Sequence, residues 1–371
     1  MDPNDAVREA LDILSPDNVR ERLDKRYGRP LLERFATSVK GCLSLDPEAA
    51  KGHGLVSVAR RILTASPESR LALTRDPALG RWTAAMEQAI DSADPSTVPG
   101  LLLLLPRLAV GGAVLEGSDL DATLVTGSGG LARIPVDGRI VAGPPGRSIR
   151  IQVRGGEVVT HGKAPMRVGP FELVSGDAEG GRMPVVRPQT GTDLFTPGAT
   201  LRKAITLLEE TAPDLLAECA ALSPVLVPLA TEEDVSQSAG LSSARGCIWM
   251  SFPPRPLVVA ETLVHEASHL LFFLVEDACP MVRGEDPPRL TVPWRTDLRP
   301  LRAVLMGLHA WVRVLRWLRR LEGTTWAQAA HQRMEILEPA VMAATEIADE
   351  ASEGLTEAGS ALVSALGTAD R

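Results

Sequence analysis

The stretch Glu261-Thr-Leu-Val-His-Glu-Ala-Ser-His-Leu-Leu-Phe-Phe273 is largely apolar and carries an HExxH motif formed by His265, Glu266 and His269. Residues four apart share one face of a helix, so both imidazoles would project side by side at the spacing that a transition metal needs. Such an apolar helix should be buried, where imidazoles and carboxylates are costly unless ligated or paired. The sequence therefore predicts a metal-binding helix; the alternative is a core helix with two hydrogen-bonded histidines.

The composition is that of a globular protein with more than one compact unit. The chain has 371 residues, of which 44% are hydrophobic and 23% charged, which is long for a single core. A net charge of −8 argues against nucleic acid as a partner. The N-terminus lacks an apolar signal segment, and the aliphatic run Leu101–Leu105 is too short to span a bilayer. We therefore expect a cytoplasmic protein that binds no membrane.

Changes in residue composition and in the spacing of apolar residues divide the chain into three regions. Residues 1–110 show apolar residues at helical spacing, and Ser or Asp before Pro supplies an N-cap and a first-turn proline, which predicts four to six short helices. Residues 111–197 are β-rich, with hairpin turns expected at Asp137-Gly138 and Gly155-Gly156. Residues 198–371 contain the HExxH motif. The expected fold is α+β: a helical N-terminal scaffold or docking region, a β-rich middle section and a zincin-like C-terminal helical metal-binding domain.

A predicted strand, Gly246–Phe252, precedes the HExxH helix. Metallopeptidases of the zincin type place an edge strand beside the metal, where an extended peptide can pair with it. Gly246–Phe252 is therefore a candidate edge strand, and an ordinary interior strand is the alternative.

A third metal ligand is expected on a later helix. The metzincin form of the motif is excluded, because its Gly and His are missing after His269. A helix predicted from about Pro300 to Glu322 has an apolar stripe with His309 at its edge, which makes His309 a candidate ligand. The other histidines, His53, His161 and His331, are expected to be peripheral. The carboxylate alternatives are Glu276, Glu335, Glu338 and Glu346.

Arginines gather at the start of the same predicted helix. Arg295, Arg299 and Arg302 oppose the helix dipole there, so helix stability does not explain their position. They are candidates to hold a carboxylate of a cosubstrate or substrate. The structural alternative is an ion pair with Asp297.

Two sequence blocks together resemble a known family. The segments Ala260-Glu-Thr-Leu-Val-His-Glu-Ala-Ser-His269 and Pro293-Trp-Arg-Thr-Asp-Leu-Arg-Pro300, with Gly307 following, resemble the HExxH-domain proteins encoded with ribosomally made peptides in bacteria. Some of these are fused or adjacent to radical-SAM cyclophane-forming maturases. The resemblance spans Gly246 to Arg320, roughly a fifth of the chain. In several relatives the later helix carries its histidine where this chain has Trp311, so His309 replaces it or the third ligand lies elsewhere.

The resemblance implies Fe(II)- and 2-oxoglutarate-dependent hydroxylation of a side-chain β-carbon in a precursor peptide. In that reading His265 and His269, with His309 or a carboxylate, bind iron, an arginine pairs with 2-oxoglutarate, and Glu266 orients a ligand or binds the metal. The HExxH motif alone favours a zinc metallopeptidase of the gluzincin type, in which Glu266 is the general base. A non-catalytic peptide-binding scaffold is the third alternative.

Overall fold

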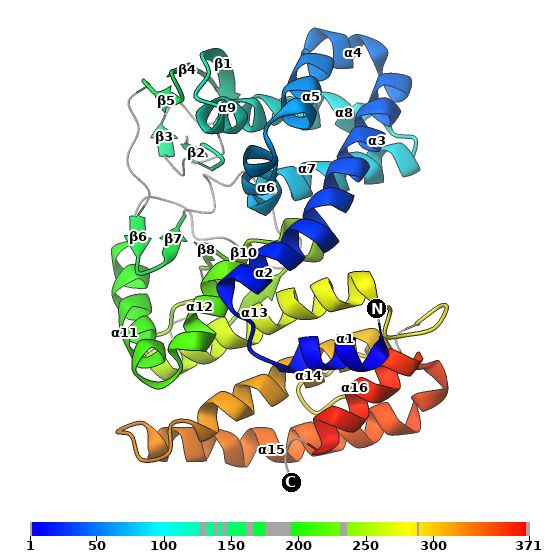
Figure 1. Cartoon of the computed structure of the whole chain (residues 1–371), viewed down its shortest axis with the longest axis vertical. Helices are drawn as coiled ribbons and strands as arrows, with labels where there is room; N and C mark the ends of the chain where they lie inside the picture. The colour runs from blue at the N-terminus through cyan, green and yellow to red at the C-terminus, as the bar shows by residue number, and fades with distance from the viewer. Residues whose placement is uncertain are drawn as a thin grey trace. The chain divides into compact units, whose positions relative to one another are not determined.

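The described residues form many helices and three small sheets, so the expected α+β class is confirmed (Figure 1). The computed structural model describes residues 2–126, 131–136, 140–142, 147–160, 166–174, 194–230, 236–287 and 289–368. Contacts group the chain into two compact units. Unit 1 comprises Met1–Arg20, Thr200–Leu222 and Pro253–Arg371, and unit 2 comprises Glu21–Ala199 and Ser223–Phe252. The first and last helices of the chain thus belong to the same unit, although they lie in different sequence regions.

Four helices of the N-terminal region, α2, α4, α6 and α7, begin at the proline of a Ser-Pro or Asp-Pro pair, as predicted. The Asp46, Ser66 and Asp76 side chains accept hydrogen bonds from backbone N–H groups in the first turns of α4, α6 and α7. The region contains nine α-helices within residues 2–126, more than the four to six expected, because further breaks fall at positions such as Gly54, a left-handed residue between α4 and α5. The helices and the π-helical and 3-10 segments are α1 (Pro3–Leu11), α2 (Pro16–Arg22), η1 (Leu23–Gly28), α3 (Arg29–Leu45), α4 (Pro47–Gly52), α5 (Leu55–Thr64), α6 (Pro67–Arg75), α7 (Pro77–Asp91), η2 (Pro95–Thr97), α8 (Val98–Leu102) and α9 (Leu105–Leu115).

The sheets of unit 2 come from the β-rich section and from residues after Leu222. Their orders are β1-β4-β5, β2-β3 and β6-β7-β8-β10-β9. The predicted turn at Gly155-Gly156 is confirmed, since both glycines have positive φ between antiparallel β4 and β5, whereas Asp137-Gly138 lies outside the described residues. The strands are β1 (Leu120–Val125), β2 (Leu131–Arg133), β3 (Ile140–Ala142), β4 (Ser148–Arg154), β5 (Glu157–Val158), β6 (Met166–Val168), β7 (Phe171–Leu173), β8 (Val225–Pro228), β9 (Ser238–Gly240) and β10 (Cys247–Met250), with a 3-10 turn η3 (Ser242–Ala244) before β10.

The strand predicted as a peptide-binding edge is an interior strand. β10 pairs in parallel with β8 and antiparallel with β9, so both of its edges are hydrogen-bonded. All four of its residues are buried, as expected for a strand with neighbours on both sides. The edge-strand hypothesis for Gly246–Phe252 is therefore wrong.

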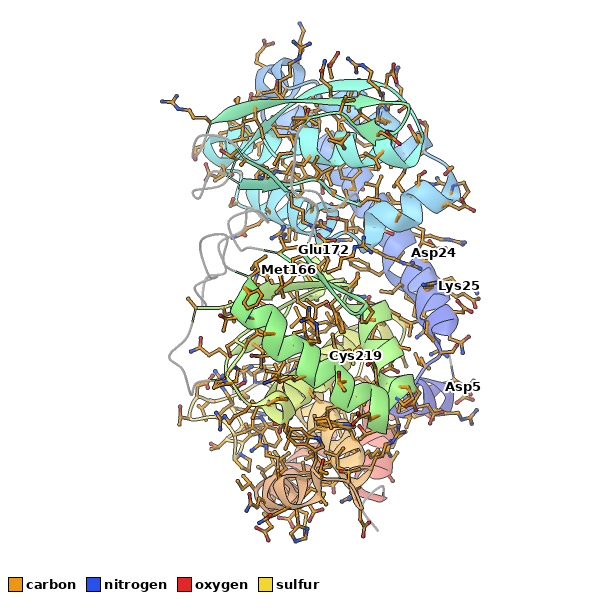
Figure 2. The ribbon with its side chains drawn as sticks, turned by 90° about the vertical axis from the view of Figure 1, so that its left-hand side faces the viewer. Asp5, Asp24, Lys25, Met166, Glu172 and Cys219 are labelled. Carbon is orange, nitrogen blue, oxygen red and sulfur yellow. The ribbon has the colours of Figure 1, made fainter. Side chains whose placement is uncertain are left out.

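A buried ion triad joins three elements of unit 2. The Arg133 guanidinium on β2 donates to Asp76 Oδ2 at 2.6 Å and to Glu172 Oε1 at 2.7 Å. Asp76 also caps α7. Glu172, which is labelled in Figure 2, lies on β7. A buried charge needs such partners, because its desolvation would otherwise be costly.

Unit 1 is a helical assembly in which α14 packs against α13, α15 and α16. Helix α13 is hydrophobic almost all round, and 15 of its residues are buried, which is the pattern of a central core helix. Its hydroxyl groups are satisfied locally, as Ser268 Oγ donates to the Val264 carbonyl at 2.7 Å. The helices are α11 (Phe195–Thr211), α12 (Pro213–Leu222), α13 (Pro256–Ala278), α14 (Leu301–Arg319), α15 (Ala327–Glu350), the 3-10 turn η4 (Ser352–Gly354) and α16 (Glu357–Thr368).

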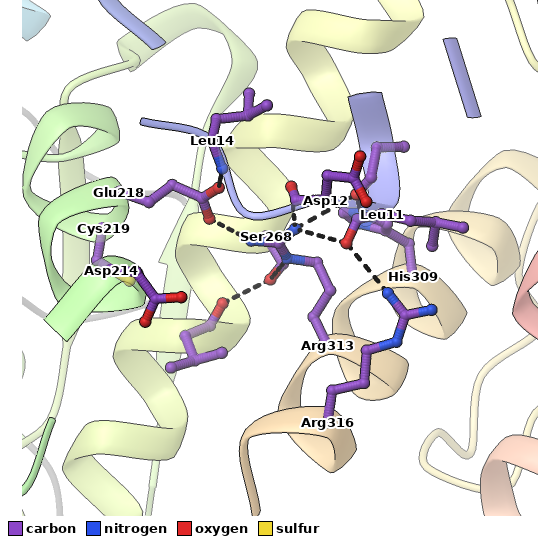
Figure 3. A network of polar contacts seen from close by, with 12 residues as sticks. Leu11, Asp12, Leu14, Asp214, Glu218, Cys219, Ser268, His309, Arg313 and Arg316 are labelled. Carbon is purple, nitrogen blue, oxygen red and sulfur yellow. Dashed lines mark hydrogen bonds and ion pairs between the residues drawn. The ribbon is translucent and has the colours of Figure 1, made fainter. Parts of the chain in front are cut away.

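Cationic side chains of α14 cap the C-terminus of α1 (Figure 3). The last carbonyls of a helix lack intrahelical partners and carry partial negative charge. Arg313 Nη1 donates to the Asp12 carbonyl at 3.0 Å, and Arg316 Nη1 donates to the Leu11 carbonyl at 3.1 Å. Arg313 also pairs with the buried Glu218 on α12, whose other oxygen accepts from the Leu14 backbone. The network holds α1 to α12 and α14.

Two helical stretches of the described chain are long and apolar enough to cross a membrane by length and composition, Pro95–Leu115 and Pro256–Ala278. The apolar window of the second is 83% buried within the fold, as for the core helix of a globular protein. The four cysteines are free thiols, and Cys42, Cys219 and Cys247 are buried.

Candidate metal centre

The HExxH residues meet on one face of α13. Each of His265, Glu266 and His269 offers a ligand atom, and these atoms lie within 4.8 Å of one another. The two imidazole centroids are 4.4 Å apart with their planes at 78°. Glu266 is 3% exposed, whereas both histidines are half-buried. The two imidazoles thus lie side by side, as the four-residue spacing predicts, and the Glu266 carboxylate lies close to them.

Both imidazoles are neutral at pH 7. Burial lowers the pKa of His265 well below its usual value, and the nearby His269 and Arg333 lower it further. Burial lowers the pKa of His269 to about 4, against a smaller raising effect of a hydrogen bond with the Met306 backbone. Within the described part of the chain, the Nδ1 atoms of both rings are buried and make no hydrogen bond. A neutral imidazole with a free nitrogen is the form that binds metals.

Tryptophans form one wall of the site. The Trp311 ring on α14 lies 4.2 Å from the His265 ring between centroids, and Trp294 lies 6.5 Å from Trp311. Trp294 packs directly on Gly307, where an added Cβ would lie 3.0 Å from the Trp294 Cζ2 atom. The second block of the family resemblance thus packs beside the metal motif, with glycine making room for the indole.

An arginine and a glutamate that we did not single out as site residues border the same wall. Arg333 on α15 donates from Nε and Nη2 to the Glu261 carboxylate at 2.7–3.1 Å. Its guanidinium carbon lies 5.5 Å from the Trp311 ring centroid. The sequence contained a signal for Glu261, which stands one helical turn before His265. It held none for Arg333, whereas the family resemblance had already drawn attention to the position of Trp311, which contacts His265.

His309 is not part of the cluster. Its side chain is fully buried, and its Nε2 atom donates to the Ala10 carbonyl at 2.5 Å. Because a carbonyl only accepts, this bond fixes the neutral tautomer with its proton on Nε2. Burial and the neighbouring Arg313 charge lower its pKa to about 3. The structure thus gives His309 a role in holding the end of α1.

The three arginines proposed as carboxylate anchors are paired with carboxylates of the chain itself. Arg295 and Arg299 both donate to Asp297, at 2.8 and 3.0 Å, which is the structural alternative considered above. The two ion pairs lower the pKa of Asp297 to about 2. Arg302 donates to Glu276 from Nε at 2.6 Å and from Nη2. The contacts therefore support a structural role for all three.

The carboxylate alternatives for a third ligand also lie outside the cluster, as far as the described residues show. Glu276 pairs with Arg302, and Glu338 accepts from Arg319 at 3.0 Å. The Oε1 atom of Glu335 lies 3.6 Å from Nε2 of His331, and both side chains are exposed on α15. Glu346 lies further along that helix. His53 ends α4 in unit 2, and His161 lies outside the described residues.

We expect His309→Leu to keep metal binding and to lose stability. Removing the N–H that pairs with the Ala10 carbonyl should lower the unfolding free energy at neutral pH by about 1–3 kcal/mol. Because the His309 pKa is depressed to about 3 from 6.5, its stabilising effect is complete above 6.5 and declines as the pH falls. That decline is about 2 kcal/mol between roughly pH 7 and pH 5, so the stability difference between wild type and variant should shrink by that amount.

Urea unfolding of both metal-free proteins at the two pH values measures this difference. His265 and His269 titrate in both proteins, so their contributions cancel. Metal analysis of the two proteins supplies the second readout. A variant that loses metal would identify His309 as a ligand after all.

The site offers two neutral imidazoles and one buried carboxylate on a rigid helix, beside an indole wall and an arginine. Such a donor set suits Zn(II), and equally the facial arrangement of two histidines and one carboxylate that binds Fe(II). No protein-family model matches the sequence, and no curated protein matches it.

Proposed function

We propose that this chain is a metal-dependent enzyme that hydroxylates a side-chain β-carbon of a ribosomally synthesised peptide, using Fe(II) and 2-oxoglutarate. The single observation that carries the metal centre is the convergence of His265, Glu266 and His269, with an unpartnered Nδ1 on each imidazole. The reaction and the peptide substrate rest on the resemblance of the two sequence blocks. A zincin-like arrangement of the C-terminal helices and a cytoplasmic location belong to the same proposal.

The residues of α13 would hold the iron, with His265 and His269 as ligands and Glu266 as the third ligand or its support. When bound, iron and 2-oxoglutarate supply the oxidation: a peptide C–H bond becomes C–OH with one atom of O₂, while 2-oxoglutarate takes the other, loses CO₂ and becomes succinate. The chain's own contribution is to fix the ligands on a buried helix and to shield one side of the site with Trp311 and Trp294.

A zinc peptidase is the second candidate, and one observation favours it. The Glu266 carboxylate lies within 4.8 Å of ligand atoms of both histidines, which suits a general base that takes a proton from water at the metal. The interior position of β10 removes Gly246–Phe252 as the edge strand that we had expected to align a peptide for cleavage.

Metal analysis and a peptide assay separate these candidates. Protein purified without added metal should contain iron, and adding 2-oxoglutarate without oxygen should produce a weak visible absorption band. With oxygen, a synthetic precursor peptide should gain the mass of one oxygen atom. Zinc, no response to 2-oxoglutarate and two shorter peptide products would support the peptidase and refute the hydroxylase. The absence of any bound metal would support a non-catalytic scaffold.

A further inference from the structure

Arg333 occupies a different position from the three arginines of the second block. Its partner Glu261 stands about one turn before His265 on α13. Its guanidinium lies over Trp311, the same indole that contacts His265. By contrast Glu276, the partner of Arg302, stands about two turns after His269, roughly 10 Å along the helix axis. Of these two arginines, each paired with a carboxylate of α13, Arg333 is the one that also contacts Trp311 beside His265.

The guanidinium of Arg333 keeps donors for a further acceptor. Its hydrogen bonds to Glu261 use Nε and Nη2, and among the described residues Nη1 makes no hydrogen bond. A guanidinium has five N–H groups in a planar fork. The side chain is 31% exposed, whereas that of Glu261 is 9% exposed, so ligands can approach the arginine more readily than its partner.

We propose that Arg333 is the carboxylate anchor of this site, with Trp311 as the surface on which its guanidinium lies. The proposal rests on the proposed metal centre and names a different residue from those that the sequence suggested. The ligand is an anion that brings a carboxylate to Arg333 while another part of it reaches His265 and His269. Its carboxylate belongs either to a small 2-oxo dicarboxylate or to an acidic group of the peptide.

Two substitutions distinguish an anchor from a structural ion pair. Arg333→Gln removes the positive charge, and Glu261→Gln removes its protein partner but leaves the guanidinium in place. If the pair only joins α15 to α13, both variants should behave alike. If Arg333 is an anchor, Arg333→Gln should weaken carboxylate binding by about 10-fold to 100-fold, as expected for a lost charged hydrogen bond. Glu261→Gln should then bind as tightly as wild type or more tightly, because the carboxylate no longer competes. Arg302→Gln is the matched control and should bind as wild type does.

Calorimetric titration without oxygen, with 2-oxoglutarate as the probe, measures the binding. A peptide with an acidic side chain is the second probe. A loss confined to one probe identifies the source of the carboxylate. Each titration is repeated on protein stripped of metal, where the ratio between wild type and Arg333→Gln should persist because the guanidinium contact does not need the metal. Failure to take up metal would thus refute the proposed function while still testing the anchor. Equal affinities of wild type and Arg333→Gln for both probes, or equal losses in Arg333→Gln and Glu261→Gln, would overturn the proposal.

Discussion

Replacing His265 or His269 by alanine is expected to abolish metal binding while leaving a folded protein. Each variant removes one of the two imidazoles that converge on α13. Loss of groups that merely support a ligand already costs about 10-fold to 100-fold in metal affinity, so loss of a ligand should cost more. Metal content after dialysis against a weak chelator measures the effect, and circular dichroism reports the fold.

The core should tolerate these changes, because both imidazoles are half-buried and their Nδ1 atoms support no hydrogen bond among the described residues. His331→Ala is the matched control, since His331 is an exposed histidine of the same unit. It should leave metal content unchanged. Stoichiometric metal in folded His265→Ala or His269→Ala would refute the proposed metal centre. The histidines would then be hydrogen-bonding residues of a core helix.

The sequence predicted the features that depend on residues close together in the chain, namely helix starts, the HExxH helix and the ion pairs of Asp297. Asp46 and Asp76 precede prolines, and each caps the helix that follows. Such caps are predictable because the carboxylate acceptor and the fixed φ of proline both act within one helical turn. The HExxH helix follows from apolar composition and four-residue spacing alone. The pairing of Arg295 and Arg299 with Asp297 was foreseeable for the same reason, since the residues lie two apart.

The features that the sequence did not predict depend on partners that are distant along the chain. His309 borders an apolar stripe as predicted, but its acceptor at Ala10 is 299 residues away and belongs to a helix whose docking no local pattern encodes. The place of β10 inside its sheet depends on pairing with β8 and β9, which alternation of residues cannot specify. Arg333 and Glu261 are 72 residues apart. Their contact beside Trp311 therefore could not be predicted from local sequence patterns.

Replacing Glu266 by glutamine should separate the two candidate chemistries by several orders of magnitude in turnover. In a peptidase, the carboxylate takes a proton from the attacking water, and loss of such a general base costs about 100-fold to 10,000-fold. The amide has the same shape and cannot accept that proton. In a hydroxylase no proton of this kind is transferred, so turnover should fall only as far as glutamine disturbs the metal.

The burial of Glu266 decides how this experiment has to be controlled. At 3% exposure, the side chain cannot be changed in size without disturbing α13, which is why glutamine is preferred to alanine. Glu276→Gln is the matched control, because it makes the same change about two turns beyond His269 and should leave turnover near wild type. Metal content of each variant must be measured first. A metal-loaded Glu266→Gln protein that still hydroxylates peptide would exclude a general-base role for Glu266. If the wild type cleaves peptide and the metal-loaded variant does not, Glu266 is the general base.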